Sequence, residues 1–157
     1  MPVATILIGL PGSGKTTFLN NQSEYHPDVC FDDFHGESLD GTGAFAQSRH
    51  YKTLKGKLRE GRDCIISDIE YCKYERMTKA EEGLRMLSDE LEVRIEIRYL
   101  YFENNPNACR HNVVHRLKRN YIEELQKIDE LSKVYRCPPD GALPSENTPG
   151  RAGGFGL

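Results

Sequence analysis

The chain has 157 residues, with 21 lysines and arginines against 24 aspartates and glutamates, which gives a net charge of −3. A chain of this length forms one domain around a single core. Its mildly acidic balance argues against a protein whose whole surface binds nucleic acid, although a local basic groove stays compatible with it. No apolar run approaches the ~20 residues that cross a bilayer, and the first residues lack the pattern of a signal peptide.

The chain opens with an apolar run at residues 4–8, which is typical of a buried parallel strand, and residues 17–20 begin a predicted helix. The eight residues from position 9 to position 16, Gly-Leu-Pro-Gly-Ser-Gly-Lys-Thr, match G-x-x-x-x-G-K-[ST] at every fixed position. The motif thus stands in the strand–loop–helix context that it requires. A glycine-rich turn that merely carries a lysine is the alternative reading.

The residue types of this motif suit a triphosphate. The glycines let the backbone curl with its N–H groups pointing inward at phosphate oxygens, and the start of the helix adds a positive dipole. Lys15 is expected to reach the β- and γ-phosphates, and the Thr16 hydroxyl to hold Mg²⁺. The predicted nucleotide-binding residues of this segment are Gly9, Pro11, Gly12, Ser13, Gly14, Lys15, Thr16 and Thr17.

The rest of the chain alternates between predicted strands and helices. Short apolar runs ending in acids predict strands, whereas apolar residues at helical spacing predict helices. The expected strands are 28–31, 64–68 and 93–102, and the expected helices are about 44–60, 74–91, 106–119 and 122–135. Residues 138–157 are rich in Pro, Gly and Ser and predict a loosely ordered tail.

This alternation predicts an α/β fold with a parallel sheet of four to five strands flanked by helices, in one domain spanning residues 1–137. In such sheets the ligand lies outside the carboxyl ends of the strands. The loop at 9–16 and the acids that follow the other strands should therefore share one rim. The five cysteines are scattered without any C-x-x-C pair, which predicts reduced thiols in a cytoplasmic protein.

Acidic residues close two of the predicted strands. Asp68 ends the third strand, where a carboxylate can hold Mg²⁺ beside Thr16 or can cap the following turn. Asp32 and Asp33 follow the second strand and point in roughly opposite directions if strand geometry persists. One of them can therefore face the γ-phosphate while the other faces the acceptor pocket or solvent. A carboxylate at this place can accept the proton of an attacking hydroxyl and orient it. A solvated acidic turn is the alternative.

The predicted helix at 106–119 is strongly basic. Arg116 and Arg119 share a face, and Arg110 lies within about 120° of Arg116. Guanidinium groups that fold over a transferring phosphoryl group stabilise its charge, whereas a solvated amphipathic helix needs no ligand. His111 and His115 stand at i, i+4 but have no third metal ligand nearby in sequence.

The ordered set G-L-P-G-S-G-K-T, F-D-D-F-H, I-I-S-D and Y-L-Y-F-E…A-C-R-H-N-V-V-H-R resembles the small P-loop kinases of the bacteriophage polynucleotide 5′-kinase type and the related AAA-like ATP-binding kinases. The resemblance covers about residues 4–135. It implies a P-loop NTPase fold with a basic helical lid, with ATP and Mg²⁺ bound and a hydroxyl group as the acceptor. Relatives also carry a further strand after the last helix, where this chain has a poor strand pattern at 141–144.

The resemblance also implies roles for single residues. It makes Asp32 the general base and Asp68 the acid of the third strand. It places His35 where a basic residue, usually arginine, grips the acceptor phosphate. Arg116 corresponds to a lid arginine, and the upstream one corresponds to Arg110 or, with the alignment shifted by two, to Asn112.

We therefore expect a cytoplasmic kinase that transfers the γ-phosphoryl of Mg·ATP. Lys15, Asp32 and Arg116 are the expected catalytic residues, and Arg110 and Arg119 are expected to bind the nucleotide. The expected substrate-binding residues are Asp33, His35 and Asp68. The first acceptor is a polynucleotide 5′-hydroxyl, and a sugar- or nucleoside-like hydroxyl is the alternative. A nucleotide-dependent switch, or a degenerate kinase without transfer activity, is the rival from another class.

Overall fold

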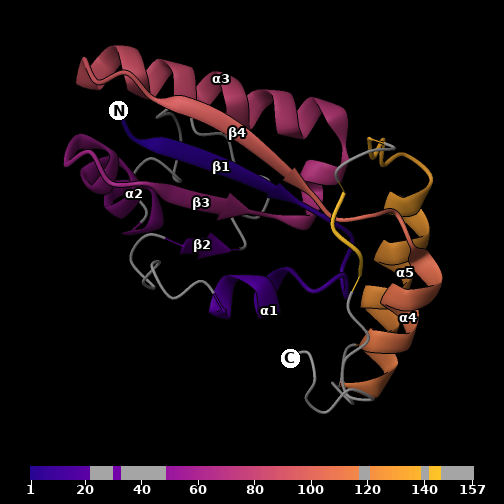
Figure 1. Cartoon of the computed structure of the whole chain (residues 1–157). Helices are drawn as coiled ribbons and strands as arrows, with labels where there is room; N and C mark the ends of the chain where they lie inside the picture. Colours follow the sequence, from indigo (N-terminus) through magenta and orange to yellow (C-terminus); the bar gives the residue numbers. More distant parts are fainter. Residues whose placement is uncertain (22–29, 33–48, 117–120, 139–141, 146–157) are drawn as a thin grey trace.

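The computed structural model describes residues 1–21, 30–32, 49–116, 121–138 and 142–145. Strands and helices alternate along these residues, as the α/β prediction required (Figure 1). The strands are β1 Val3–Ile8, β2 Cys30–Asp32, β3 Cys64–Ser67 and β4 Glu96–Tyr101. The α-helices are α1 Lys15–Asn20, α2 Arg49–Arg59, α3 Tyr74–Leu91, α4 Pro106–His115 and α5 Tyr121–Ser132, and a 3-10 helix, η2, spans Ile69–Cys72.

The four strands form one parallel sheet in the order β2-β3-β1-β4. The chain leaves β1 towards one edge of the sheet, returns through β2 and β3, and then crosses over β1 to add β4 at the other edge. The direction of progress therefore reverses between β3 and β1, which are neighbours in the sheet. The crevice outside the carboxyl ends of such a strand pair is where open α/β sheets bind ligands.

Helices cover both faces of the sheet. Alternate residues of each strand point to opposite faces, so Ile6 and Ile66 pack in a core with α2, α3, α4 and α5, whereas Leu7 and Ile65 pack with α1. On the α1 side, the ring of Phe18 meets the ring of Phe102 edge to face, with the centroids 6.1 Å apart. Figure 1 shows α3 and α1 on opposite sides of the strands.

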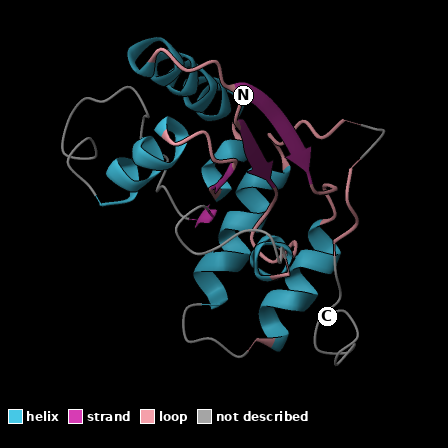
Figure 2. Cartoon of the chain, turned by 60° about the vertical axis from the view of Figure 1, so that its left-hand side comes forward, coloured by secondary structure: helices cyan, strands magenta, loops and turns pink. Residues whose placement is uncertain are grey.

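The last two helices, α4 and α5, lie side by side beyond the carboxyl ends of the strands. The strand arrows point towards this end of the molecule in the views of Figure 1 and Figure 2. The buried residues Cys109 and Val113 of α4 and Ile128 and Leu131 of α5 join the main core. The α4–α5 pair thus closes the end of the molecule at which a ligand of the sheet is expected.

The chain after α5 returns to the end of β4. The Tyr135 hydroxyl donates to the Phe102 carbonyl and lies 3.4 Å from the Ile8 carbonyl. Leu143 forms a parallel bridge with Phe102: its amide donates to the Tyr101 carbonyl (2.8 Å), and its carbonyl accepts from the Glu103 amide (2.7 Å). In the described residues, this edge of the sheet carries a bridge and no fifth strand.

Most predicted elements agree with the structure, and α3 agrees at both ends. The strand β4 differs, because the alternating pattern from 93 predicts a strand that in fact begins only at Glu96. The reason is the partner strand: Glu96 pairs with Val3, the first residue of β1, and its amide donates to the Pro2 carbonyl at 2.9 Å. No described strand extends far enough to pair with residues 93–95. The sequence also did not predict η2.

Among the described residues, no helix combines the length and the apolar character that crossing a membrane demands. Four cysteines are free thiols in the structure: Cys64, Cys72 and Cys109 are buried, and Cys137 is half-buried.

Candidate functional site at the carboxyl ends of β1 and β3

The loop that joins β1 to α1 turns on two glycines in the left-handed region. Gly12 has a φ of 81° and Gly14 has a φ of 104°. L-residues with a side chain adopt these angles only with strain, whereas glycine adopts them readily. The Ser13 amide donates to the Leu10 carbonyl at 3.1 Å, which closes the turn between them. The glycines of the motif therefore sit where the backbone requires them.

Gly9 and Gly12 are also places without room for a side chain. A Cβ on Gly9 would lie 2.6 Å from the Ser13 Oγ and 3.0 Å from the Phe102 Cβ. A Cβ on Gly12 would lie 2.6 Å from the Cys109 carbonyl oxygen and 2.9 Å from a Val113 methyl group. The neighbours of Gly9 are thus the loop itself and the residue that follows β4, and the neighbours of Gly12 belong to α4.

Lys15 folds back over the start of the loop. Its side chain is buried, with 7% of the residue exposed, and its Nζ donates to the carbonyls of Gly9 (2.7 Å) and Leu10 (2.9 Å). Charge-assisted bonds of this kind hold an ammonium group more firmly than neutral ones do. Lys15 therefore concentrates positive charge at the carboxyl end of β1.

The helix α4 packs against the loop along one face. Asn112 is 2% exposed, and its Nδ2 donates to the Gly12 carbonyl at 2.9 Å, across 100 residues of chain. Cys109 and Val113 lie next to it on the same face and touch the space beside Gly12. Sequence reasoning named Asn112 only as an alignment alternative for a lid arginine. A polar residue between buried Cys109 and Val113 on an amphipathic helix was the signal available in the sequence.

Asp68 follows β3 on the same rim and is 1% exposed. Its Oδ1 accepts from the Glu70 amide at 2.9 Å and so caps η2. The capping role that the sequence offered as one alternative is thus confirmed. A carboxylate has about four acceptor sites, so this bond is compatible with the other alternative, a magnesium ligand.

Buried hydroxyl groups without a hydrogen-bond partner gather around the same two strand ends. In the described part of the chain these are the hydroxyls of Ser13, Ser67 and Tyr71. Ser13 lies in the loop after β1, Ser67 ends β3, and Tyr71 lies in η2. Buried polar groups normally have a partner, and an orphaned one often marks an absent water, ion or ligand. The sequence did not single out Ser67 or Tyr71.

The charges of the site affect the pKa values of two buried thiols, Cys72 and Cys109. Burial raises the pKa of the Cys72 thiol to about 12, while the Lys15 ammonium opposes that rise and Asp68 adds to it. Burial also raises the pKa of the Cys109 thiol, against opposing effects that include a hydrogen bond with Ser145 and the charge of Lys15. The charge of Lys15 therefore acts on residues of both η2 and α4. Both thiols stay protonated near neutral pH.

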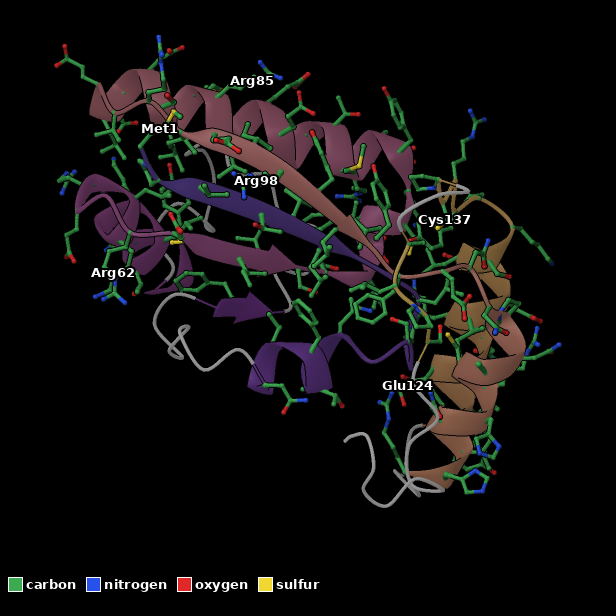
Figure 3. All side chains as sticks on the ribbon, in the orientation of Figure 1. Met1, Arg62, Arg85, Arg98, Glu124 and Cys137 are labelled. Atoms are coloured by element: carbon green, nitrogen blue, oxygen red, sulfur yellow. The ribbon has the colours of Figure 1, made fainter. Side chains whose placement is uncertain are left out.

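Two of the predicted arginines, Arg110 and Arg116, pair with α5. The Arg116 Nη1 lies 3.5 Å from the Glu124 Oε1, and Glu124 is labelled in Figure 3 on the α4–α5 pair. Arg110 donates to Asp129 at 2.9 Å and to Asn107 at 2.8 Å. The hydrogen bond from Arg110 lowers the pKa of the Asp129 carboxyl, and the charges of Arg110 and Lys133 lower it further. The structure thus ties Arg110 to α5 through an exposed ion pair with Asp129.

Of the site residues predicted at the end of β2 and just after it, the structure describes only Asp32. Asp32 ends β2, and its backbone pairs in register with Ser67 of β3. Because the strands are parallel, Asp32 lies at the same rim as the loop and Asp68. Asp33, His35 and Arg119 lie outside the described residues.

The helix α4 also carries two exposed histidines. The rings of His111 and His115 have centroids 3.9 Å apart, and the His115 Nδ1 lies 2.9 Å from the His111 carbonyl oxygen. No group of three or more His, Cys, Asp or Glu residues suited to a metal ion occurs among residues 1–21, 30–32, 49–116, 121–138 and 142–145.

The structure thus brings the glycine loop, Lys15, Thr16 and Asp68 to one rim at the β1–β3 reversal. Thr16 is exposed on the first turn of α1, whereas Lys15 and Asp68 are buried. Backbone amides and an ammonium group favour an anion at this rim, and hydroxyl and carboxylate oxygens favour a hard cation beside it.

Comparison of the sequence with models of known protein families gives no match, and comparison with curated proteins gives none either.

Proposed function

We propose that this protein is an ATP-dependent kinase with a P-loop NTPase fold, which transfers the γ-phosphoryl of Mg·ATP to a hydroxyl acceptor. One observation carries the proposal: the G-x-x-x-x-G-K-T motif lies between β1 and α1 at the reversal of strand order. There its glycines take left-handed angles, and its lysine is folded over the loop. Motif, backbone geometry and place in the sheet all suit phosphate binding.

The residues present fit Mg²⁺. The Thr16 hydroxyl and the Asp68 carboxylate are oxygen donors from neighbouring strand ends, and Mg²⁺ prefers one or two such protein ligands together with phosphates and waters. The partnerless Ser13 and Ser67 hydroxyls indicate that polar groups are missing from this rim. When bound, Mg²⁺ would neutralise charge on the transferring phosphoryl group and its leaving oxygen.

The chain's own residues would then bind and orient the reactants. The loop amides would cradle the phosphates, and Lys15 would exchange its bonds to the Gly9 and Leu10 carbonyls for bonds to phosphate oxygens. Asp32 would accept the proton of the acceptor hydroxyl. The oxygen of that hydroxyl would then bond to the γ-phosphorus, while the bond between the γ-phosphorus and the leaving oxygen of ADP breaks. Arg116, which follows the last turn of α4, would stabilise charge on the transferring group.

The first acceptor we propose is a polynucleotide 5′-hydroxyl, from the sequence resemblance, with His35 in the place of the gripping arginine. The alternative acceptor is a sugar- or nucleoside-like hydroxyl. The predicted cytoplasmic compartment goes with this proposal, since buried free thiols such as Cys64 persist in a reducing compartment.

The experiment that tests the function measures transfer of radiolabelled γ-phosphate from Mg·ATP. One reaction contains 5′-hydroxyl oligonucleotides, and a second contains pooled nucleosides and sugars. We expect label in an acceptor with the wild type, and a loss of about 10²–10⁴-fold in the Asp32→Ala rate with nearly unchanged ATP affinity. Asp89→Ala is the matched control, because this exposed carboxylate lies near the end of α3, which leads into the amino end of β4 and not into the carboxyl ends of the strands.

Label in the oligonucleotide supports the first acceptor, and label only in the small molecules supports the alternative. If the protein binds ATP but transfers phosphate to neither acceptor, the proposed kinase activity is wrong. A nucleotide-dependent switch or a degenerate kinase is then the better interpretation. Equal losses of ATP binding and turnover in Asp32→Ala would overturn the role of Asp32 as a base.

The two roles of Asp68 can be separated by substitution. Asp68→Asn keeps an oxygen that caps η2, so we expect nearly unchanged stability, but the loss of charge should weaken Mg²⁺-dependent ATP binding by about 10- to 100-fold. Asp68→Ala should lose both functions, with a stability cost of about 1 kcal/mol for the cap. Thermal unfolding and calorimetric titration of ATP with and without Mg²⁺ measure the two effects. If Mg²⁺ strengthens ATP binding by the same factor in Asp68→Asn as in the wild type, Asp68 is not a magnesium ligand and its proposed role reduces to capping η2.

A further inference from the structure

One buried contact of the loop comes from outside the sequence motif, from the helix α4. A loop that turns its N–H groups inward, towards an anion, turns carbonyl groups outward, and each buried carbonyl needs a donor from elsewhere. Lys15 serves the Gly9 and Leu10 carbonyls. The Gly12 carbonyl is served by the side-chain amide of Asn112, which is buried and comes from α4.

We infer, building on the proposed phosphate-binding role of the loop, that Asn112 is a positioning residue that holds the loop in its anion-binding conformation and fixes α4 to it. The inference has two independent supports. One is the 2.9 Å bond from Asn112 Nδ2 to the Gly12 carbonyl. The other is the close packing of α4 at the same place, where a Cβ on Gly12 would meet the Cys109 carbonyl at 2.6 Å.

The bond orients the peptide unit between Gly12 and Ser13. When the carbonyl of that unit points at Asn112, its N–H, which belongs to Ser13, points the opposite way and donates to the Leu10 carbonyl. Loss of the Asn112 donor would leave a buried carbonyl unsatisfied and would free this peptide unit to rotate. The backbone that follows, up to Lys15, would then lose its fixed direction.

The bond between Asn112 and the Gly12 carbonyl also fixes the position of the Arg116 backbone relative to the loop. Asn112 and Arg116 are one helical turn apart, so a helix fixed at Asn112 holds the Arg116 backbone at a constant distance from the loop. The α4 helix up to Val113 is thereby part of the core and acts as a wall of the site. This arrangement joins the loop after β1 to the helix after β4, which are far apart in sequence.

The test uses the full chain and two substitutions at Asn112. Asn112→Ala removes the donor, and Asn112→Asp keeps the shape but places a carboxylate against the Gly12 carbonyl. We expect the Kd for ATP to rise at least tenfold in Asn112→Ala and further in Asn112→Asp. Inorganic tripolyphosphate, which has no base or sugar, should lose affinity by the same factor, because the effect lies in the phosphate cradle.

The matched control is Ile128→Val, which shortens a fully buried side chain of α5 in the same core. It should lower the melting temperature and leave the Kd for ATP unchanged when measured well below that temperature. If Asn112→Ala also lowers the melting temperature without changing the Kd for ATP or tripolyphosphate, Asn112 only supports the core and the inference is overturned.

Hydrogen exchange decides the question even if the wild type binds no nucleotide, an outcome that would refute the proposed function and not this inference. The Ser13 amide bonds to the Leu10 carbonyl within the loop. We expect its exchange in the free protein to be at least tenfold faster in Asn112→Ala than in Ile128→Val. Equal protection of this amide in the two variants would overturn the inference.

Discussion

Replacement of Lys15 by methionine should weaken ATP binding by at least about 100-fold and lower phosphoryl transfer by about 10²–10³-fold or more. The methionine side chain fills a similar volume, so the variant removes mainly the buried ammonium group. That group donates to the Gly9 and Leu10 carbonyls at 2.7 and 2.9 Å, and in the proposed complex it would donate to phosphate oxygens. Calorimetric titration with ATP and single-turnover transfer measure the two losses.

Lys15→Met should also change stability, because two loop carbonyls lose a charged donor. We expect a cost of about 1–3 kcal/mol in the free energy of unfolding, measured by thermal or urea denaturation. Lys79→Met is the matched control, since Lys79 is exposed on α3, and it should leave ATP affinity unchanged. Wild-type ATP affinity in Lys15→Met would mean that the loop is not the phosphate site, and it would refute the proposed function at its first step.

Gly12→Ala should be the most destabilising glycine substitution in the described residues. The new methyl group would require a left-handed backbone with a φ of 81°, which strains L-residues, and it would lie 2.6 Å from the Cys109 carbonyl oxygen. Strain and overpacking together should lower the free energy of unfolding by about 2–5 kcal/mol. ATP binding should be lost as well, because the loop and α4 must separate to admit the methyl group.

Two other glycines separate the causes of this effect. Gly61 has a φ of 80° with open space around its Cβ position, so Gly61→Ala should show strain alone, about 1–2 kcal/mol. Gly56 lies within α2 and also has open space, so Gly56→Ala should stabilise the protein by about 0.5–1 kcal/mol. Urea denaturation measures all three variants. If Gly12→Ala costs no more than Gly61→Ala, α4 does not press on the loop as the structure indicates.

The alternation of strands and helices could be predicted because its signals are local. The apolar spacing of residues 74–91 matches α3 at both ends, and the apolar runs at 4–8 and 64–68 match β1 and β3 within one residue. The loop of the candidate site was also predictable, since its glycines and lysine are neighbours in sequence and stand between β1 and α1. Periodicity and turn chemistry depend on residues close in the chain.

Contacts between residues far apart in the chain could not be predicted from the sequence. The start of β4 at Glu96 depends on where β1 begins, because a strand needs a partner to pair with. Glu124 and Asp129 of α5, the partners of Arg116 and Arg110, became known only once α4 and α5 were placed side by side. The roles of Asp68 were left open by the sequence, and the structure confirmed the cap, which spans two residues.

By itself, the sequence determined the α/β class of the fold, the order of most of its elements and the place of the glycine-rich loop at 9–16 after the first strand. Only the tertiary structure decided that β3 and β1 are neighbours, that Asp68 lies on the same rim as Lys15, and that Asn112 holds the Gly12 carbonyl from 100 residues away. The physical reason is one of range. Backbone angles and apolar periodicity act within a few residues, whereas a hydrogen bond between the first loop and the fourth helix exists only after the sheet has set the strand order.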